Sequence, residues 1–112
     1  MLIIVALSQA VAEEGAVYAA FISDTDRHNS KGEALTTVED ILRQDRANYH
    51  NGKGDRKDED DGGMFSTKAG RAKFENCVVV FENLKASDVI SGRQSSLVVR
   101  VIGQRIYVEA VE

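Results

Sequence analysis

The chain contains no proline and no tryptophan, only one cysteine and few aromatic residues. Average usage would place about five or six prolines in a chain of this length. Because proline is one of the residues that keep an edge strand from pairing, we expect any exposed sheet edge here to be open to another chain. The single cysteine, Cys77, excludes an intramolecular disulfide and a thiolate metal cluster within one chain. Its position in the run Cys77–Val80 favours a small buried thiol over a nucleophile.

Apolar side chains are missing from the stretch between His50 and Gly63, which holds four glycines and eight charged residues. Such a stretch cannot join a hydrophobic core, and most connections in compact domains are only about 4–6 residues long. We therefore predict a single domain over residues 1–112 with a projecting polar loop at about 49–73 that a partner orders. The residues expected to carry this interaction are Lys53, Asp55, Arg56, Lys57, Asp58, Glu59, Asp60, Asp61, Lys68, Arg71 and Lys73.

The formal net charge of −4 argues against a protein that wraps nucleic acid with a broad basic face. The apolar run Leu2–Leu7 has the character of a signal peptide, but no positive residue precedes it and the segment is short for a signal. It is also too short to span a bilayer. We predict a buried first strand there, no membrane association and a cytoplasmic location.

After the strand at Leu2–Leu7, the N-terminal half predicts a second strand and one helix. Residues 8–15 fit either a helix interrupted by Gly15 or a connection, and we favour the connection, followed by a strand over 16–22. The sequence from Ser30 to Glu33 fits a capping box, which predicts an amphipathic helix over about 31–48. Its apolar face would hold Leu35, Val38, Ile41 and Leu42, and its other face Glu39, Arg43, Asp45 and Arg46.

The C-terminal half predicts a sheet. Residues 74–84 alternate as a strand, and residues 85–96 form a polar connection whose apolar pair Val89–Ile90 should tuck under the sheet. Residues 97–111 indicate a hairpin, because Gly103 at the first position of a two-residue loop is typical of a type II′ turn. The fold class predicted is α+β, with a small antiparallel sheet or barrel, one amphipathic helix and the long polar loop.

One cluster near the end of the predicted strand 16–22 could carry chemistry. Asp24, Asp26 and His28 are residue types that bind divalent cations for phosphoryl chemistry. The same spacing is typical of a polar turn in which carboxylates bond their own backbone, and we favour that interpretation. The prediction is a protein without catalytic residues, metal or cofactor; the alternative is a small metal-dependent nucleic-acid enzyme that uses these three residues.

A short basic stretch follows the polar run. Lys68, Arg71 and Lys73 lie close in sequence to Phe65 and Phe74, a combination that can contact a nucleic-acid backbone. Three charges make a small footprint for nucleic acid. We expect these residues instead to lie at the root of the loop and to pair with an acidic surface on a neighbour.

The order of elements resembles that of a viral family. The strand Gly15–Asp24, a long insertion, the segment Val80–Val89 and the closing hairpin with Gly103, Tyr107 and Val111 resemble the head–tail joining (head-completion or stopper) proteins of tailed phages. The resemblance implies a small β-barrel that forms a ring between portal and tail. It also implies a loop that reaches neighbouring subunits or the DNA channel, and a place in the virion.

The function predicted from these observations is a non-enzymatic assembly protein that forms a homo-oligomer and contacts other assembly proteins. Contact with DNA would be passive, since an acidic loop repels phosphate. A second alternative, besides the metal enzyme, is a regulator that presents its acidic loop to a basic partner.

Overall fold

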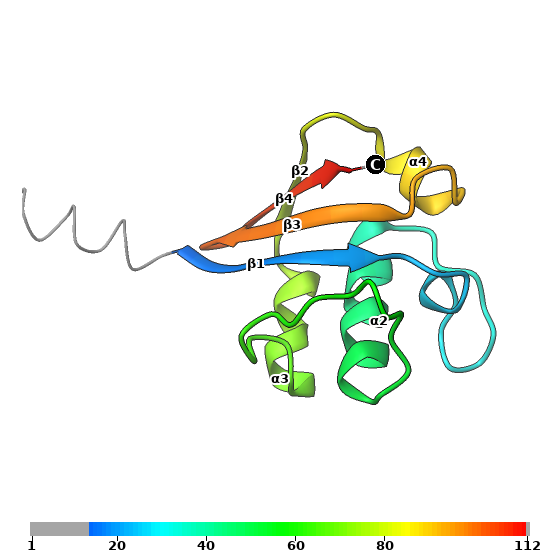
Figure 1. Cartoon of the computed structure of the whole chain (residues 1–112), viewed down its shortest axis with the longest axis horizontal. Coiled ribbons are helices and arrows are strands. Elements are labelled where there is room, and N and C mark those ends of the chain that lie inside the picture. The colour runs from blue at the N-terminus through cyan, green and yellow to red at the C-terminus, as the bar shows by residue number, and fades with distance from the viewer. Residues whose placement is uncertain (1–13, 112) are drawn as a thin grey trace, which may run out of the picture.

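The computed structural model of the protein describes residues 14–111 (Figure 1). In chain order its elements are β1 (Glu14–Phe21), the 3-10 helix η1 (Thr25–Arg27), α2 (Val38–His50), α3 (Lys68–Arg71), the 3-10 helix η2 (Ala72–Glu75), β2 (Val78–Phe81), α4 (Ala86–Ile90), β3 (Ser96–Ile102) and β4 (Arg105–Ala110). The predicted α+β class is confirmed, and the strand expected over 16–22 is β1. The strand expected at Leu2–Leu7 lies outside the described residues.

The four strands form one open sheet in the order β1-β3-β4-β2. β3 pairs antiparallel with β1 and with β4, whereas β2 joins β4 in parallel. The sheet is therefore mixed rather than wholly antiparallel. The barrel alternative is wrong, because β1 and β2 do not pair with each other and the sheet stays open. A sheet of four strands is also too narrow to close into a barrel.

One face of the sheet forms the hydrophobic core. Tyr18, Val99 and Val108 lie side by side across three strands, and each is fully buried. Helix α2 covers this face with Val38, Ile41 and Leu42, and α3 lies beside it on the same side of the sheet (Figure 1). No described helix covers the opposite face, where Val17 at one end keeps 54% of its surface exposed and Val78 at the other keeps 59%.

The predicted hairpin is confirmed in detail. Ile102 pairs with Arg105, which leaves Gly103 and Gln104 as a two-residue loop between β3 and β4. Gly103 has φ 58°, and Gln104 does not have a positive φ. A positive φ at the first position alone is the backbone of a type II′ turn, which glycine adopts without steric cost.

The amphipathic helix begins later than predicted. Thr37, not Ser30, is its N-cap, and the Thr37 hydroxyl accepts a hydrogen bond from the Asp40 N–H at 3.2 Å. Upstream, the Asn29 side chain accepts hydrogen bonds from two backbone N–H groups, and Gly32 has φ 80°. An asparagine that bonds its own backbone favours a turn over a helix, so the segment that resembles a capping box folds as a tight turn.

Two other predicted boundaries are wrong. The strand expected over 74–84 is confined to β2, because Phe74 lies in η2 and is buried against Phe65, with 4.6 Å between ring centroids. The connection expected over 85–96 contains α4, whose start is fixed by a hydrogen bond from the Lys85 N–H to the Asp88 carboxylate. Val89 on this short helix is fully buried, as expected for the apolar pair.

Candidate functional site

The polar loop, defined here as residues 51–63, does not project as a whole. Its acidic half lies along the outer edge of β1, where Glu59 donates its N–H to the Ala19 carbonyl at 2.8 Å. The Glu59 carboxylate accepts from the Ala19 N–H, and the Asp58 carboxylate accepts from the Phe21 N–H, both at 2.8 Å. The predicted loop was to project and to be ordered by a partner; its acidic half is ordered instead by the edge strand of the same chain, whose backbone groups bond these carboxylates.

A buried arginine holds the loop in this position. Arg46 of α2 has no exposed surface, and its Nη1 donates to the Glu59 carbonyl at 2.9 Å and to Asp61 Oδ2 at 3.3 Å. Its Nη2 donates to Asp58 Oδ1 at 3.4 Å, and its Nε donates to Asp45 Oδ2 at 2.9 Å. A guanidinium suits this role because its donors spread in one plane and can meet several acceptors at once.

The Arg46 guanidinium also lies between two aromatic rings. Its carbon is 4.1 Å from the centroid of Tyr18 and 4.5 Å from that of Tyr49. Cation–π contacts of this kind stabilise most when they are removed from water. The Arg46 guanidinium thus joins β1, α2 and the polar loop. Its N–H groups form hydrogen bonds at the edge of the group, and the two aromatic rings pack on its flat faces.

Acidic groups outnumber the cation in this cluster. Burial raises the pKa of Asp45 to about 9, although Arg46 acts to lower it. Among the residues that the structure describes, Asp45 Oδ1 and the Tyr18 hydroxyl are buried and have no hydrogen-bond partner. For Asp61, burial acts to raise the pKa, but hydrogen bonds from His50 and the Phe65 N–H leave it below its ordinary value. Because Asp45 has no exposed surface, we assign the cluster to structure rather than catalysis.

The alternative metal ligands do not converge. Asp26 is buried and accepts hydrogen bonds from the Ser23 N–H at 2.9 Å and from Asn48 Nδ2 at 2.8 Å. His28 lies with Nδ1 2.8 Å from the backbone oxygen of Asp24, not from its carboxylate. These residues form the polar turn that we favoured from the sequence. Asp26 bonds the backbone of the turn and Asn48 of α2, and His28 contacts the backbone of Asp24.

A different trio does come together among the described residues. His50, Asp60 and Asp61 offer ligand atoms that all lie within 4.8 Å of one another. However, Asp61 Oδ2 already lies 2.7 Å from His50 Nε2 and 3.3 Å from Arg46 Nη1. A cation placed there would have to displace the arginine that anchors the loop, so the geometry favours an internal ion pair.

The edge of β2 differs from that of β1. The N–H groups of Val78 and Glu82 donate to the β4 side, to the carbonyls of Gln104 and Val108 at 2.9 and 3.0 Å. Since alternate residues of a strand bond to opposite sides, the N–H and C=O groups of Val79 and Phe81 point away from the sheet. No hydrogen bond to these outward groups is found within residues 14–111.

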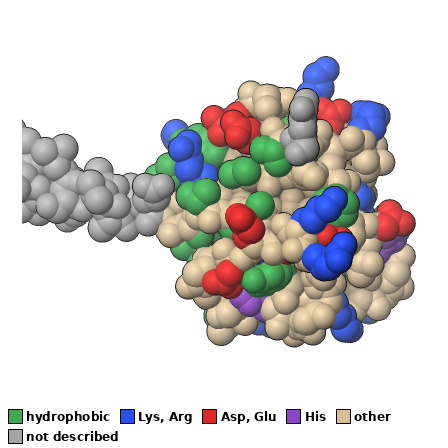
Figure 2. Space-filling model, viewed as in Figure 1, with side chains coloured by type: hydrophobic (Ala, Val, Ile, Leu, Met, Phe, Trp, Pro, Cys, Tyr) green, Lys and Arg blue, Asp and Glu red, His purple; other side chains and the backbone are tan. Residues whose placement is uncertain are grey.

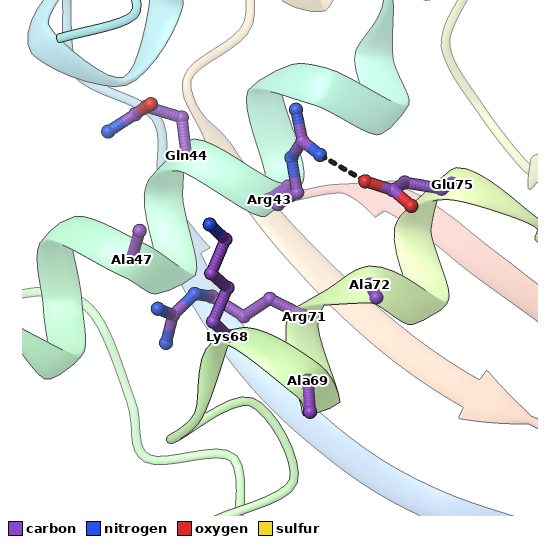
Figure 3. Close-up of a pocket in the computed structure, with 8 residues that line it drawn as sticks. All are labelled: Arg43, Gln44, Ala47, Lys68, Ala69, Arg71, Ala72 and Glu75. Carbon is purple, nitrogen blue, oxygen red and sulfur yellow. Dashed lines mark hydrogen bonds and ion pairs between the residues drawn. The ribbon is translucent and has the colours of Figure 1, made fainter.

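A pocket of about 730 Å³ lies between α2 and the segment formed by α3 and η2 (Figure 3). Arg43 crosses its rim and forms an ion pair with Glu75 at 2.7 Å. Arg71 donates to the Phe65 carbonyl at 2.9 Å, whereas the Lys68 side chain extends toward α2 and has no ion-pair partner within residues 14–111 (Figure 3). The other residues that line the pocket are Gln44, Ala47, Ala69 and Ala72.

The predicted interaction residues are thus divided among different places. Lys53, Asp55, Arg56, Lys57 and Asp60 are exposed on the polar loop; Asp58, Glu59 and Asp61 bond inward; Lys68 and Arg71 line the pocket; and Lys73 lies beside it, at a shallower hollow. In the view of Figure 2, basic, acidic and hydrophobic side chains are interspersed over the surface.

Sequence reasoning missed Arg46 and Arg43 as functional residues. Asp45 and Arg46 were assigned to the wet face of the helix, yet they continue the spacing of its buried residues Val38, Ile41 and Leu42. A charged pair on an apolar stripe, next to a loop rich in carboxylates, is the signal that would have found the cluster. No comparable signal marks Arg43.

Within residues 14–111, no helix has the length and apolar character that crossing a bilayer requires. Comparisons of the chain with protein-family models, with curated proteins and with solved structures found no match.

Proposed function

We propose that the protein is a non-enzymatic assembly component that forms a homo-oligomer through the outer edge of β2. The supporting observation is the contrast between the two sheet edges. The β1 edge is bonded by the polar loop, whereas β2 presents backbone groups of Val79 and Phe81 that have no partner within residues 14–111. Proteins generally cover or charge such an edge when it is not meant to pair.

A second copy fits this edge in one simple register. In an antiparallel pairing with a two-fold axis at Val80, Val79 of each copy lies opposite Phe81 of the other copy, which gives two equivalent pairs. Each such pair exchanges two hydrogen bonds, so four bonds form in all. Val78 then lies opposite Glu82 of the other copy, on the open face. An interface of this kind is isologous, because the same strand serves both partners.

The dimer would be the unit of a larger assembly. If the resemblance to phage head–tail joining proteins holds, the further partners are other assembly proteins, contact with DNA is passive, and the protein resides in the virion. Otherwise a cytoplasmic location is proposed. A closed ring needs a second, heterologous contact in addition to the two-fold one.

The experiment is sedimentation equilibrium over a concentration series, on the parent chain and on Val78→Glu. The substitution places like charges opposite each other, which destabilises a strand pair, so we expect the parent to be dimeric or larger and Val78→Glu to be monomeric. Adding Glu82→Lys to Val78→Glu restores opposite charges and should restore association.

Val17→Glu is the matched control, because Val17 has similar exposure on the same face but lies on the covered strand. It should leave association unchanged. A parent chain that is monomeric at every concentration would overturn the proposal. Equal disruption by Val17→Glu and Val78→Glu would also contradict it, since the face rather than the β2 edge would then be the interface.

A further inference from the structure

The pocket between α2 and α3 concentrates positive charge on a protein whose formal net charge is −4. Arg43, Lys68 and Arg71 line it, and Glu75 is the single acidic residue among the lining residues. Two guanidinium groups and one ammonium, opposed by one carboxylate, leave a net charge of +2 among the lining residues, although Arg43 also pairs with Asp40, outside the lining, at 3.6 Å. Such a local excess favours a ligand that carries about two negative charges.

The shape of the pocket suits a small molecule. Its volume of about 730 Å³ falls within the range of sites for small ligands, roughly 300–1,000 Å³. Its apolar lining consists of Ala47, Ala69 and Ala72, whose short side chains leave room for a flat or aliphatic body. Cationic groups and small apolar side chains in one lining together match an amphipathic anion.

Of the three cations, Lys68 has the most freedom to bind a ligand. Its side chain is directed from α3 toward Gln44 and Ala47 (Figure 3). Arg71 already donates from Nη1 to the Phe65 carbonyl, which fixes its direction and leaves its other donors. Arg43 and Glu75 keep 40% and 55% of their side-chain surface exposed, so their ion pair can open at little cost.

We propose that this pocket binds a small organic phosphate monoester, with the phosphate held by Lys68 and Arg71 and the organic body against the alanine side chains of the lining. Arg43 contributes after it exchanges Glu75 for the phosphate. This binding is independent of pairing through β2, because the pocket lies on the helical side of the sheet.

The probe is phenyl phosphate, titrated into ¹⁵N-labelled protein and followed by amide chemical shifts. Shift changes should be confined to residues 43–47 and 68–75. Inorganic phosphate and benzyl alcohol, which each carry half of the probe's chemistry, should bind at least about tenfold more weakly. Lys68→Gln should weaken phenyl phosphate binding by about tenfold, the size expected for one charge-assisted hydrogen bond.

Lys53→Gln is the matched control, since it removes the same charge from an exposed site on the polar loop. It should leave the affinity unchanged. Equal weakening by both variants, or equal affinity for inorganic phosphate and phenyl phosphate, would overturn the proposal. A DNA duplex that binds more tightly than phenyl phosphate, and responds equally to both substitutions, would show general polyanion attraction and would overturn it too.

Discussion

Glu59 and Ala19 exchange two hydrogen bonds, one from each backbone N–H, although they lie forty residues apart in the chain. The Ala19 N–H donates to the Glu59 carboxylate and the Glu59 N–H donates to the Ala19 carbonyl, each at 2.8 Å. The loop residue therefore acts as a short extra strand beside β1. A segment that looks fully solvated in sequence is in part a cover for the sheet.

Removing the carboxylates that cover β1 should uncover a second pairing edge. In the double variant Asp58→Ala with Glu59→Ala, the Ala19 and Phe21 N–H groups lose their acceptors, so we expect a fall in stability of about 1–3 kcal/mol. Self-association should also increase, and it should persist when Val78→Glu is added, because it would use β1. Urea unfolding and sedimentation measure the two effects.

The matched control removes two other acidic residues of the same loop, Asp55→Ala with Asp60→Ala. Both bond only backbone N–H groups two residues ahead, so the β1 edge stays covered. This variant should remain near the parent in stability and mass. If it associates as strongly as the first variant, loss of negative charge and not exposure of the edge is responsible.

Replacing Arg46 by lysine should destabilise the protein although the charge is kept. Lysine cannot reach Asp45, Asp58, Asp61 and the Glu59 carbonyl together, and it does not stack between two rings in the same way. Breaking a buried ion pair leaves carboxylates uncompensated, which typically costs about 3–5 kcal/mol. Urea unfolding should show a cost of this order for Arg46→Lys.

Arg43→Lys, one turn earlier on the same helix, is the comparison. Arg43 is 40% exposed, and its ion pair with Glu75 is screened by water, so the expected change is under about 0.5 kcal/mol. Equal costs at the two positions would mean that Arg46 acts only as a helix former.

Stability should fall as pH rises because of Asp45. Its pKa of about 9 in the folded protein lies above the unfolded value of about 4, so the folded state binds the extra proton between these limits. Asp45 therefore stabilises most below about pH 4, and its contribution decreases with a slope of up to about 1.4 kcal/mol per pH unit until pH passes its folded pKa.

Asp45→Asn imitates the protonated acid at every pH. The variant should match the parent in acid and exceed its stability at pH 8, as measured by urea midpoints across the range. The folded pKa of Asp61 is lowered, so its contribution to stability is lost as pH falls rather than as pH rises. This loss occurs only in acid and is the same in the parent and in Asp45→Asn. Parallel stability profiles of parent and variant between pH 5 and 8 would show that Asp45 is ionised in the folded protein.

Thr37→Ala and Ser30→Ala distinguish the observed start of α2 from the start that the sequence suggested. Thr37 accepts the Asp40 N–H, so its loss should cost about 1 kcal/mol. Ser30 lies in an exposed turn, and its loss should change stability by less than about 0.5 kcal/mol. Thermal unfolding of the two variants gives the comparison, and a larger cost at Ser30 would favour the earlier start.

Local signals in the sequence predicted the parts of the fold that local physics decides. The turn at Gly103 needs one residue with positive φ, and the strand that became β1 is marked by a short continuous apolar run. The start of α2 was predicted wrongly because Asn29 and Ser30 each offer a plausible local hydrogen bond, and only packing decides between them. The strand over 74–84 was overextended because Phe74 is as apolar in a 3-10 helix as in a strand.

The candidate sites depended on contacts between distant segments, and apart from the charged pair Asp45–Arg46 on the apolar stripe of α2 no local pattern indicated them. Arg46 meets the loop twelve to fifteen residues later, and the loop meets β1 some forty residues earlier. Lys68 and Arg71 were recognised as a basic pair, but their pocket exists only because α2 lies opposite. Sequence alone could propose the charges and could not place their partners.

The parallel pairing of β2 with β4 has a consequence for synthesis on the ribosome. Both β1 and β2 reach the sheet only by bonding to β3 or β4, and these two strands follow them in the chain. The sheet therefore cannot begin to form until the final hairpin has left the exit tunnel. A nascent chain would hold the valine-rich segments of β1 and β2 without sheet partners until β3 and β4 have emerged.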